Sequence, residues 1–417
     1  MTEKDAARTA LGHVRICDLS GQLAGAGATR FAAALGAEVI RVEDPVRMGR
    51  WDVLRGAPPF VDERRGNEFG GAFNNHNVEK LGVTINLRTP EGKEVFDRLV
   101  SVSDVVMENF AAGVMARMGY SYERLRELRP DIIYVSNCGF GHSGPYAPFK
   151  TWGPVVQAFS GLTFSSGLPD RPSAGFGFSY MDHQGANFMV IATLGALAQR
   201  HRTGEGQWID MSCAEAGATL LGPSVLDFTV NGRHLRRPGL PHSNRSQSPP
   251  MAPHNIYATA GTDEWIAVAC RSDDDWMAMR EVVAEPWALS SRFETLAARL
   301  EHQDEMDANL EQWTMRHDRF ELAASLQEAG VPAAAVQRPG ERIDHDPSTA
   351  SWGLWPVATH PIMGEVRVEG LPIHLSDTDW CIRRGAPLLG EHNDYVFGEL
   401  LGIDASRRAD LRKSGAI

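Results

Sequence analysis

Near the N-terminus, two predicted strands flank a glycine-bearing turn and a predicted helix. Apolar residues dominate the strands at 14–19 and 37–42, and an alanine-rich helix is predicted between them at 26–35. A strand, a helix and a strand in this order form a βαβ unit, in which the two strands run parallel. This pattern restricts the chain to an α/β fold built on a parallel sheet.

The same alternation continues downstream. Helices are predicted at 91–100 and 121–127, and strands follow them at 104–107 and 131–135. Repeated βα units build a wound parallel sheet with helices on its faces. We therefore predict a large Rossmann-like domain.

The turn after the first strand is rich in glycine but does not complete a dinucleotide-binding fingerprint. It contains Gly21, Gly25 and Gly27, whereas Arg30 occupies the next position of the spacing. We interpret it as a tight turn that lets the helix pack closely on the strand, with direct phosphate contact as the less favoured alternative.

The composition changes around 231–253 to Arg, Pro, Ser, Asn and His, which indicates an exposed loop and a boundary. Strands are then predicted at 256–259 and 265–269, and helical patterning runs through 273–328. This part of the chain predicts a smaller α+β domain.

The chain then returns to the first domain, with a strand predicted at 366–368 and a closing helix at 392–401. We predict two domains: the large α/β domain comprises 1–225 and 330–417, and the small α+β domain comprises 226–329.

The chain has 417 residues, of which 43% are apolar, and a formal net charge of −12. Nucleic acids and anionic membrane surfaces bind cationic patches, and no basic stripe is present. No apolar run reaches the roughly 18 residues of a membrane span, and residues 1–12 lack the apolar core of a secretory signal. We expect a soluble, unexported protein with neither nucleic acid nor membrane as a partner.

The cysteines predict neither a disulfide framework nor a zinc site, because they are odd in number, scattered and never in a Cys-x-x-Cys pair. They are Cys17, Cys138, Cys213, Cys270 and Cys381. We expect a cytoplasmic location and no bound metal. Cys138 follows a predicted strand, but no motif places a base beside it, so we interpret it as a packed thiol.

The stretch from Tyr180 to Gly185 places a single carboxylate, Asp182, where a predicted helix through 186–200 begins. A carboxylate at a helix start can accept backbone N–H bonds and lies in the positive end of the helix dipole, so it stays ionised at neutral pH. Local sequence leaves two interpretations open: Asp182 only caps the helix, or it acts as a nucleophile.

Several segments, taken in chain order, resemble the class III CoA-transferase family (CaiB/BaiF type), which includes formyl-CoA and carnitine CoA-transferases and the related methylacyl-CoA racemases. They are Leu35-Gly36-Ala37-Glu38-Val39-Ile40-Arg41-Val42-Glu43, Arg88-Thr89-Pro90-Glu91-Gly92-Lys93, Glu108-Asn109-Phe110, Arg117-Met118-Gly119, Gly139-Phe140-Gly141, Arg202-Thr203-Gly204-Glu205-Gly206-Gln207 and Ala386-Pro387-Leu388-Leu389-Gly390-Glu391-His392. Singly these segments are weak signals, but together they cover nearly the whole chain. The resemblance implies an interlocked dimer, with CoA as a substrate and no other cofactor.

In that family, the aspartate that opens the helix before the Arg-Thr-Gly-x-Gly-Gln segment is the covalent nucleophile, and Asp182 occupies that place. A carboxylate that attacks a thioester forms a mixed anhydride, which the released thiolate can reopen. The resemblance therefore implies that Asp182 carries first the acyl group and then CoA, before an acceptor acid takes the CoA.

The resemblance also implies a CoA pocket. Leu23 and Ala24 lie on the first βα turn, where backbone groups of the family approach the pantetheine and the thioester. The other implied contacts are Asn109, Phe110, Arg88, Arg117 and Lys150. The three cations suit phosphate groups because phosphates need fixed cationic donors; taken alone, each is typical of a solvated surface.

Departures from the family pattern bear on the acceptor acid. The first turn reads Ala24-Gly25-Ala26 where the family usually has Ala-Gly-Pro, and Pro249–Asn255 stands where formyl-CoA transferase has a mobile glycine run. A formate or oxalate acceptor is therefore not expected. The resemblance favours a larger dicarboxylic or aryl-substituted acid, with succinyl-CoA as donor, and an acyl pocket shaped by Trp152 and Gln157.

Two alternatives stay open. The racemase branch pairs its aspartate with a histidine where this chain has Trp152, and only His142 or His183 could replace that base. The chain could also be one subunit of a heteromeric transferase, because some members of the family combine two related chains. A homodimer is the expected assembly.

Overall fold

The computed structural model describes residues 9–168, 170–177, 179–241 and 243–417, so residues 1–8 of the predicted large domain lie outside the described residues. The chain divides into two compact units. Unit 1 contains the described residues up to Ser166, with Ser173–Arg233 and Thr349–Ile417, and unit 2 contains Gly167–Pro172 and His234–Ser348. The sequence analysis divided the chain at 225/226 and 329/330.

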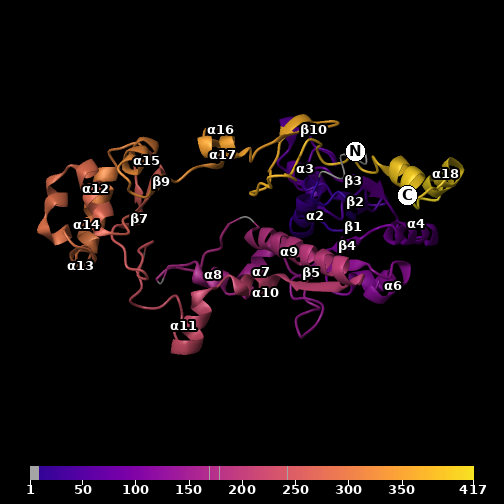
Figure 1. Cartoon of the computed structure of the whole chain (residues 1–417), viewed down its shortest axis with the longest axis horizontal. Helices are drawn as coiled ribbons and strands as arrows, with labels where there is room; N and C mark the ends of the chain where they lie inside the picture. The colour runs from indigo at the N-terminus through magenta and orange to yellow at the C-terminus, as the bar shows by residue number, and fades with distance from the viewer. Residues whose placement is uncertain (1–8, 169, 178, 242) are drawn as a thin grey trace. The chain divides into compact units, whose positions relative to one another are not determined.

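Unit 1 is built on a six-stranded sheet in which every neighbouring pair of strands runs parallel. The strands are β1 (Arg15–Asp18), β2 (Glu38–Glu43), β3 (Leu81–Thr84), β4 (Val105–Glu108), β5 (Ile133–Cys138) and β6 (Trp208–Ser212). Their order across the sheet is β3-β2-β1-β4-β5-β6, and Figure 1 labels β3, β2, β1, β4 and β5 in this order. The predicted α/β class is therefore confirmed. In sheets of this order, ligands bind at the carboxyl ends of the strands where the order reverses, which here lies between β1 and β4.

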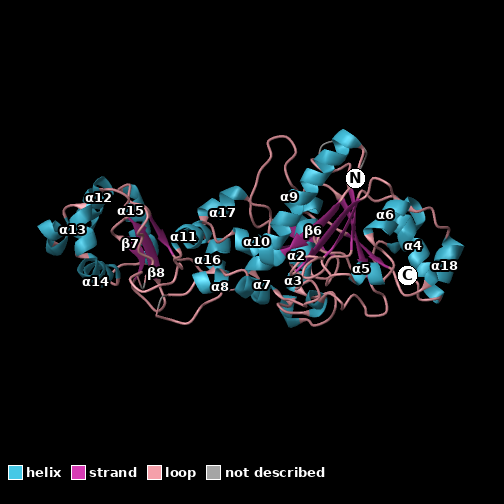
Figure 2. Cartoon of the chain, turned by 90° about the horizontal axis from the view of Figure 1, so that it is seen from below, coloured by secondary structure: helices cyan, strands magenta, loops and turns pink. Residues whose placement is uncertain are grey.

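Helices cover both faces of this sheet (Figure 2). The larger helices of unit 1 are α2 (Ala24–Ala34), α4 (Pro90–Ser101), α6 (Tyr122–Leu128), α9 (Tyr180–Thr203) and α18 (Ala405–Lys413). The shorter helices are η1 (Val53–Gly56), η2 (Val61–Glu63), α3 (Gly71–His76), α5 (Val114–Arg117), α7 (Gly153–Phe159), α8 (Leu162–Ser165), α10 (Cys213–Thr219), α11 (Pro223–Asn231) and η5 (Asp394–Leu400). One apolar core joins the sheet to α2 and α9, and a second joins it to α4, α6 and α18.

The start of α4 shows how local sequence sets a helix end. Thr89 is the N-cap, and its hydroxyl oxygen accepts the backbone N–H of Gly92 at 3.0 Å. Pro90 follows as the first helical residue and Glu91 lies in the first turn. A capping hydroxyl, a proline with no N–H to satisfy and an acidic first turn all favour a helix start. Much of the Arg88–Lys93 motif is therefore a helix-initiation signal.

The face formed by α2 and α9 depends on small residues. Most residues of α2 are alanine or glycine, and Ala26, Ala28 and Ala33 are buried. On α9, Ala186 and Ala196 are buried in the same core. Small side chains let the two helix backbones approach closely, so α2 and α9 hold each other at a short separation.

The C-terminal segment completes the core of unit 1. Phe397 and Leu411 are buried in the same cluster as Cys17 of β1 and Val106 of β4. The backbone N–H of His392 donates to Gly82 O at 2.9 Å, and its ring Nδ1 accepts the N–H of Gly82 at 3.1 Å. These bonds anchor the last helices to β3. The antiparallel pair β10 (Val357–His360) and β11 (Gly364–Arg367) precedes this segment.

Unit 2 combines a three-stranded antiparallel sheet with helices. Its strands are β7 (His254–Ala258), β8 (Trp265–Ala269) and β9 (Ala333–Ala335). Its helices are α12 (Asp273–Val283), η3 (Pro286–Leu289), η4 (Ser291–Phe293), α13 (Leu296–Glu301), α14 (Gln303–Thr314), α15 (Arg319–Glu328) and α16 (Pro339–Asp344), and α17 (Pro347–Trp352) crosses the boundary with unit 1. The core contains Trp276, Phe293 and Trp313. The buried Arg299 lies over the Trp276 ring at 5.5 Å, which adds a cation–π contact.

Several elements differ from those predicted. The sequence analysis did not place β3 and β6, which are the two edge strands of the sheet. Both are short, β3 contains Gly82, and β6 contains the polar residues Asp210 and Ser212, so neither shows the apolar run of a central strand. The closing helix, expected at 392–401, is a π-helix over Asp394–Leu400.

A cluster of buried charges lies beneath the turn that follows β1. Lys80 donates to Asp18 Oδ2 at 3.2 Å, and Arg41 donates to Asp52 Oδ2 at 2.7 Å, with all four side chains fully buried. Burial by itself raises the pKa of Asp18, but Lys80, Arg41 and the hydroxyl of Ser20 outweigh it and hold that pKa below its ordinary value. Buried charges are tolerated only when paired, so these contacts are obligatory for this part of the fold.

Within the described residues, no helix combines the length and apolar character required to cross a bilayer.

We predict that Lys80→Met destabilises the protein by about 3 to 5 kcal/mol, because it leaves the Asp18 carboxylate buried without its closest cation. The measurement is the free energy of unfolding in urea. Arg407→Met serves as the control, since the ion pair of Arg407 with Glu94 is exposed and should contribute less than about 1 kcal/mol. A Lys80→Met protein as stable as the control would contradict the prediction.

Candidate active site

One side chain links the turns that follow β1 and β4. The amide of Asn109, which follows β4, accepts the N–H of Gly21 at 2.8 Å and donates to Gly21 O at 3.0 Å. Gly21 lies on the turn after β1, so these two bonds join the two turns at the point where the strand order reverses. Asn109 therefore holds these two turns together, and its amide already has protein partners.

Two aromatic rings lie next to this link. Trp51 and Phe110 have ring centroids 5.3 Å apart at an interplanar angle of 60°. Trp51 also lies directly against Gly21, where an added Cβ would be 2.5 Å from its ring. The guanidinium of Arg41 lies 5.5 Å from the centre of the Trp51 ring and supports it from the buried charge cluster. The sequence analysis missed Trp51, because it lies in a stretch without helix or strand periodicity.

A cavity of about 170 Å³ opens at the carboxyl ends of β1, β2 and β3. Trp51, Phe110 and Arg88 line it, together with apolar residues such as Leu19 and Met118. Its lining also contains two acidic residues, Asp44 and Glu43, the second of which is paired with Arg55. Apolar walls with a few charged groups are typical of a ligand-binding cavity. The structure thus brings the predicted residues Arg88 and Phe110 to one cavity.

The three predicted phosphate-binding cations are all exposed. Among the described residues, none of Arg88, Arg117 and Lys150 has an ion-pair partner, and only Arg117 makes a side-chain hydrogen bond, a long one of 3.4 Å to Ala112 O. Arg117 lies on α5 and Lys150 lies in the loop before α7, and neither of them lines the cavity. Unpaired exposed cations remain available to phosphate groups.

The helix that carries Asp182 begins earlier than predicted. α9 starts at Tyr180, with Ser179 as its N-cap residue, so Asp182 lies within the first turn. The interpretation of Asp182 as only an N-cap is therefore wrong. Ser179 has a φ of 50°, a left-handed conformation that side chains other than glycine rarely adopt. The chain thus makes a sharp turn immediately before the candidate nucleophile.

The carboxylate of Asp182 rests against the backbone of α7. An added Cβ on Gly153 would lie 2.7 Å from Asp182 Oδ2, so only glycine leaves room for the carboxylate there. Burial raises the pKa of Asp182, although a hydrogen bond with the Ser179 side chain and the nearby His183 oppose the rise. This direction is opposite to the one that the helix end alone predicts. The cause is the loss of water around the carboxylate.

The first βα turn lies one helical turn away from Asp182. An added Cβ on Gly185 of α9 would be 3.1 Å from Cys213 Sγ, 3.3 Å from Asn137 Nδ2 and 3.7 Å from Ala24 Cβ. Leu23 and Ala24 are both buried. The predicted residue Ala24 is therefore close to the helix of Asp182. The sequence analysis did not single out Asn137 as a neighbour of this helix.

The two predicted acyl-pocket residues lie on or beside α7 and differ in exposure. The side chain of Trp152, at the N-cap position, is 60% exposed, whereas Gln157 is 3% exposed. Gln157 Nε2 is buried without a hydrogen-bond partner within the described chain. A buried amide donor without a partner is costly, which makes it available to a bound oxygen atom.

The environment of Cys138 corrects one expectation. His142 Nδ1 lies 3.8 Å from Cys138 Sγ, so a base is in fact placed beside this thiol. Burial nevertheless raises the pKa of Cys138 to about 11, which disfavours the reactive thiolate. The interpretation of a packed thiol rests on this burial. Over the described chain, no cluster of His, Cys, Asp and Glu is arranged to hold a metal ion.

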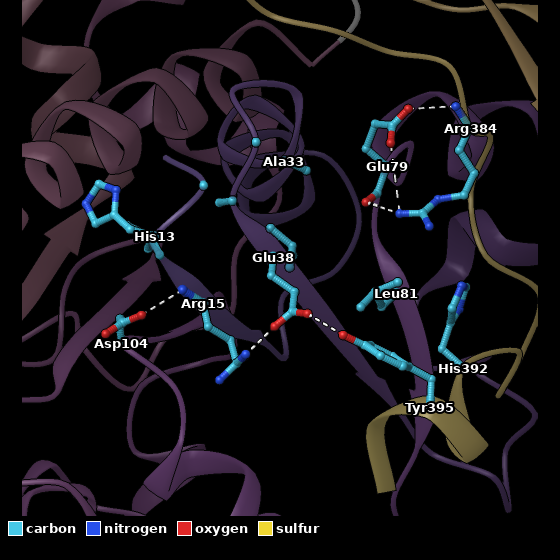
Figure 3. Close-up of a pocket in the computed structure, with 15 residues that line it drawn as sticks. His13, Arg15, Ala33, Glu38, Glu79, Leu81, Asp104, Arg384, His392 and Tyr395 are labelled. Atoms are coloured by element: carbon cyan, nitrogen blue, oxygen red, sulfur yellow. Dashed lines mark hydrogen bonds and ion pairs between the residues drawn. The ribbon is translucent and has the colours of Figure 1, made fainter. Parts of the chain in front are cut away.

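A larger cavity, of about 760 Å³, lies at the opposite edge of the sheet, by the amino ends of β1, β2 and β3 (Figure 3). Its charged residues pair with each other: Arg15 with Glu38, and Arg384 with Glu79. None of the predicted site residues lines it. Size alone therefore does not identify the active site, and the cavity beside Phe110 is the better candidate.

Three comparisons bear on this site. The family model described as CoA-transferase family III matches residues 11–393. The chain is 32% identical to the succinyl-CoA–D-citramalate CoA-transferase of Chloroflexus aurantiacus, over 98% of both chains. It is 32% identical to the succinate–glutarate CoA-transferase of Agrobacterium fabrum, over 97% of this chain and 99% of that one. A crystal structure of a CaiB/BaiF family protein from Brucella suis superposes with a TM-score of 0.83 at 31% identity, covering 94% of this chain and 100% of that chain.

Proposed function

Because this chain belongs to CoA-transferase family III, we propose that it transfers CoA from an acyl-CoA to a carboxylic acid, with Asp182 as the covalent carrier. The observation that carries this proposal is the placement of the Asp182 carboxylate. It rests against Gly153, in the first turn of α9 and one helical turn from the β1–α2 turn. In doubly wound sheets the ligand site lies at the carboxyl ends of the strands, and the Asp182 carboxylate is proposed to lie there.

The proposed reaction begins with attack of an Asp182 oxygen on the thioester carbonyl carbon. The C–S bond breaks, CoA leaves as the thiolate, and a mixed anhydride remains on Asp182. The thiolate then attacks the aspartyl carbonyl carbon, which releases the donor acid and leaves an aspartyl-CoA thioester. The acceptor carboxylate attacks this thioester and releases the thiolate again. Attack of the thiolate on the acceptor acyl carbon forms the product acyl-CoA and restores Asp182.

The burial of Asp182 supports this role. Burial raises its pKa, which shows that the ionised form is poorly solvated in the folded protein. A poorly solvated carboxylate loses less hydration on attacking a carbonyl carbon, so its intrinsic reactivity is greater. The same partial burial would limit the access of water to the anhydride and thioester intermediates.

The CoA moiety is proposed to lie along the carboxyl edge of the sheet. Phe110 offers an apolar surface, and Arg88, at the same cavity, offers a cation for phosphate. Arg117 and Lys150 are exposed cations that could serve the remaining phosphates. The acyl end would reach the buried turn at Leu23 and Ala24. CoA enters as a substrate, and the proposed reaction uses no other cofactor.

The proposed acceptor is a dicarboxylic acid and the proposed donor is succinyl-CoA. The named substrates of both relatives, D-citramalate, glutarate and succinate, are dicarboxylic acids. Gln157 Nε2 supplies a buried donor, without a partner in the described chain, that suits a carbonyl or carboxylate oxygen of such an acid. The exposed indole of Trp152 supplies an apolar wall at the start of the same helix.

The protein is proposed to act as a homodimer. No residue of α11 is buried, although four of its nine residues are large and apolar. The exposed fractions are 44% for Val225, 64% for Leu226, 52% for Phe228 and 76% for Val230. An apolar helix surface of this kind is unfavourable in water and typical of an interface. A second copy of the chain is the occupant that the family resemblance implies.

Asp182→Asn should abolish CoA transfer, because a carboxamide cannot form the anhydride, while the fold is retained. The assay uses succinyl-CoA with a panel of dicarboxylic acids and detects the products by mass spectrometry. Hydroxylamine added during turnover should convert Asp182 of the unmodified enzyme to a hydroxamate, found by peptide mapping. Glu215→Gln, an exposed carboxylate on α10, is the control and should remain active. An active Asp182→Asn enzyme would refute the role of Asp182.

Gly153→Ala should lower kcat by about 10- to 100-fold, because the added methyl group displaces the Asp182 carboxylate from its reactive position. The matched control is Gly195→Ala on α9, where an added Cβ meets no atom within 4 Å. The control should keep kcat unchanged and gain up to about 1 kcal/mol of helix stability. Equal activity of the two variants would show that the contact at Gly153 does not position the nucleophile.

Leu226→Asp should convert the dimer to a monomer, because it places a charge in the apolar surface of α11. Sedimentation velocity measures the change in mass. Met277→Asp is the control: Met277 is 49% exposed on α12, a helix that buries an apolar face of its own. A Leu226→Asp protein that sediments like the unmodified chain would exclude α11 from the dimer interface.

A further inference from the structure

A fully buried carboxylate lies directly beneath the turn that carries Asn109 and Phe110. Glu108 is the last residue of β4 and is 1% exposed. Its Oε2 accepts the backbone N–H of Phe110 at 2.5 Å, and its Oε1 accepts the hydroxyl of Tyr134 at 2.7 Å. A carboxylate that accepts two such bonds fixes the direction in which the chain leaves the strand.

This turn also borders the cavity at the carboxyl edge of the sheet. Asn109, the residue next to Glu108, makes the two hydrogen bonds to Gly21 that join the β4 turn to the β1 turn. Phe110 packs against Trp51 and lines the cavity at the carboxyl edge. A change at Glu108 would therefore reach both turns at once, without any contact between Glu108 and the reacting atoms.

Other ionisable groups face Glu108 from the neighbouring elements. His142 Nε2, in the loop after β5, lies 4.0 Å from Glu108 Oε1, and its Nδ1 lies 3.0 Å from Asp210 Oδ1 on β6. Tyr134 and Cys138 approach from β5. Among the described residues no lysine or arginine pairs with Glu108, so its charge depends on these groups and on two hydrogen bonds.

We propose that Glu108 is a positioning residue for CoA: its ionised carboxylate holds the Asn109–Phe110 turn in the binding conformation, and protonation of Glu108 loosens that turn. This inference rests on the proposed function, because it assigns the binding of CoA to the crevice beside Phe110. On this proposal, protonation of the buried Glu108 carboxylate at the end of β4 controls the affinity for CoA.

The acidity of Glu108 supports this inference. Burial raises the pKa of Glu108 to about 7, with a further rise from Asp210, while the hydrogen bonds from Tyr134 and from the Phe110 N–H lower it. The carboxylate therefore loses its charge as the pH falls through about 7. The neutral acid is a weaker acceptor for the Phe110 N–H, so CoA should bind less tightly at lower pH.

The test measures KM for succinyl-CoA, kcat and, by calorimetry, the Kd of CoA alone from about pH 6 to about pH 8.5. In the unmodified enzyme, KM and Kd should rise as the pH falls through the pKa of Glu108. Glu108→Gln, which is isosteric with the neutral acid, should raise KM and Kd about tenfold at the upper end of this range. Both constants should then no longer change with pH, and kcat should stay within about threefold of its original value.

Two further variants should move the transition in opposite directions. Tyr134→Phe removes a hydrogen bond that lowers the pKa of Glu108, so the rise in Kd should shift to higher pH. Asp210→Asn removes a negative charge that raises this pKa, so the rise should shift to lower pH. A purely structural role for Glu108 would change stability without these shifts.

The inference is overturned if Glu108→Gln keeps the original Kd with its pH dependence, or if it lowers kcat alone. If CoA does not bind to the unmodified enzyme at any pH, the proposed function itself fails, and the role of Glu108 within it fails too. The calorimetric measurement needs no turnover, so it separates these results from the outcome for Asp182→Asn.

Discussion

The buried ion pairs beneath the β1 turn are the interaction on which the rest of unit 1 depends. Lys80 with Asp18, and Arg41 with Asp52, connect the ends of β1 and β2 to segments that follow them in the chain. Charges without access to water must be paired, so these ion pairs hold each segment where its charged side chain meets its partner. Arg41 also donates to the carbonyl of Ser20 at 2.8 Å, within the turn that borders the ligand crevice. The position of the turn after β1 therefore depends on the buried charged side chains that hold it, Arg41 among them.

The site brings together parts of the chain that are far apart in sequence. The β1 turn and the β4 turn meet through Asn109, and α9 carries Asp182 against α7. Small residues on α2 and α9 permit this closeness, and Gly153 leaves room for the carboxylate. Family membership identifies the class of reaction, whereas these contacts hold the carboxylate of the proposed nucleophile, Asp182, in one position. Glu108 adds a second buried carboxylate, which holds the turn of Asn109 and Phe110 and which we propose to act through that turn on the binding of CoA.

Some features could be predicted from the sequence and others could not. The βαβ alternation predicted the parallel sheet, because apolar strands separated by amphipathic helices have few other stable arrangements. The edge strands β3 and β6 were missed, since short strands with glycine or polar residues carry little pattern. Trp51 was missed because it lies outside periodic structure. The raised pKa of Asp182 was also missed, because helix-end effects are visible in sequence but burial is not.

The sequence by itself determined the class of fold, the family and the identity of the candidate nucleophile, because strand and helix periodicity and ordered motifs are local properties of the chain. Only the tertiary structure decided that the Asp182 carboxylate lies against Gly153 and that the Asn109 amide is hydrogen-bonded to the backbone of Gly21. It also decided that Glu108 is buried without a lysine or arginine partner among the described residues. These facts depend on how distant segments pack and exclude water. Desolvation and hydrogen-bond partners are properties of the packed chain, which no local pattern records.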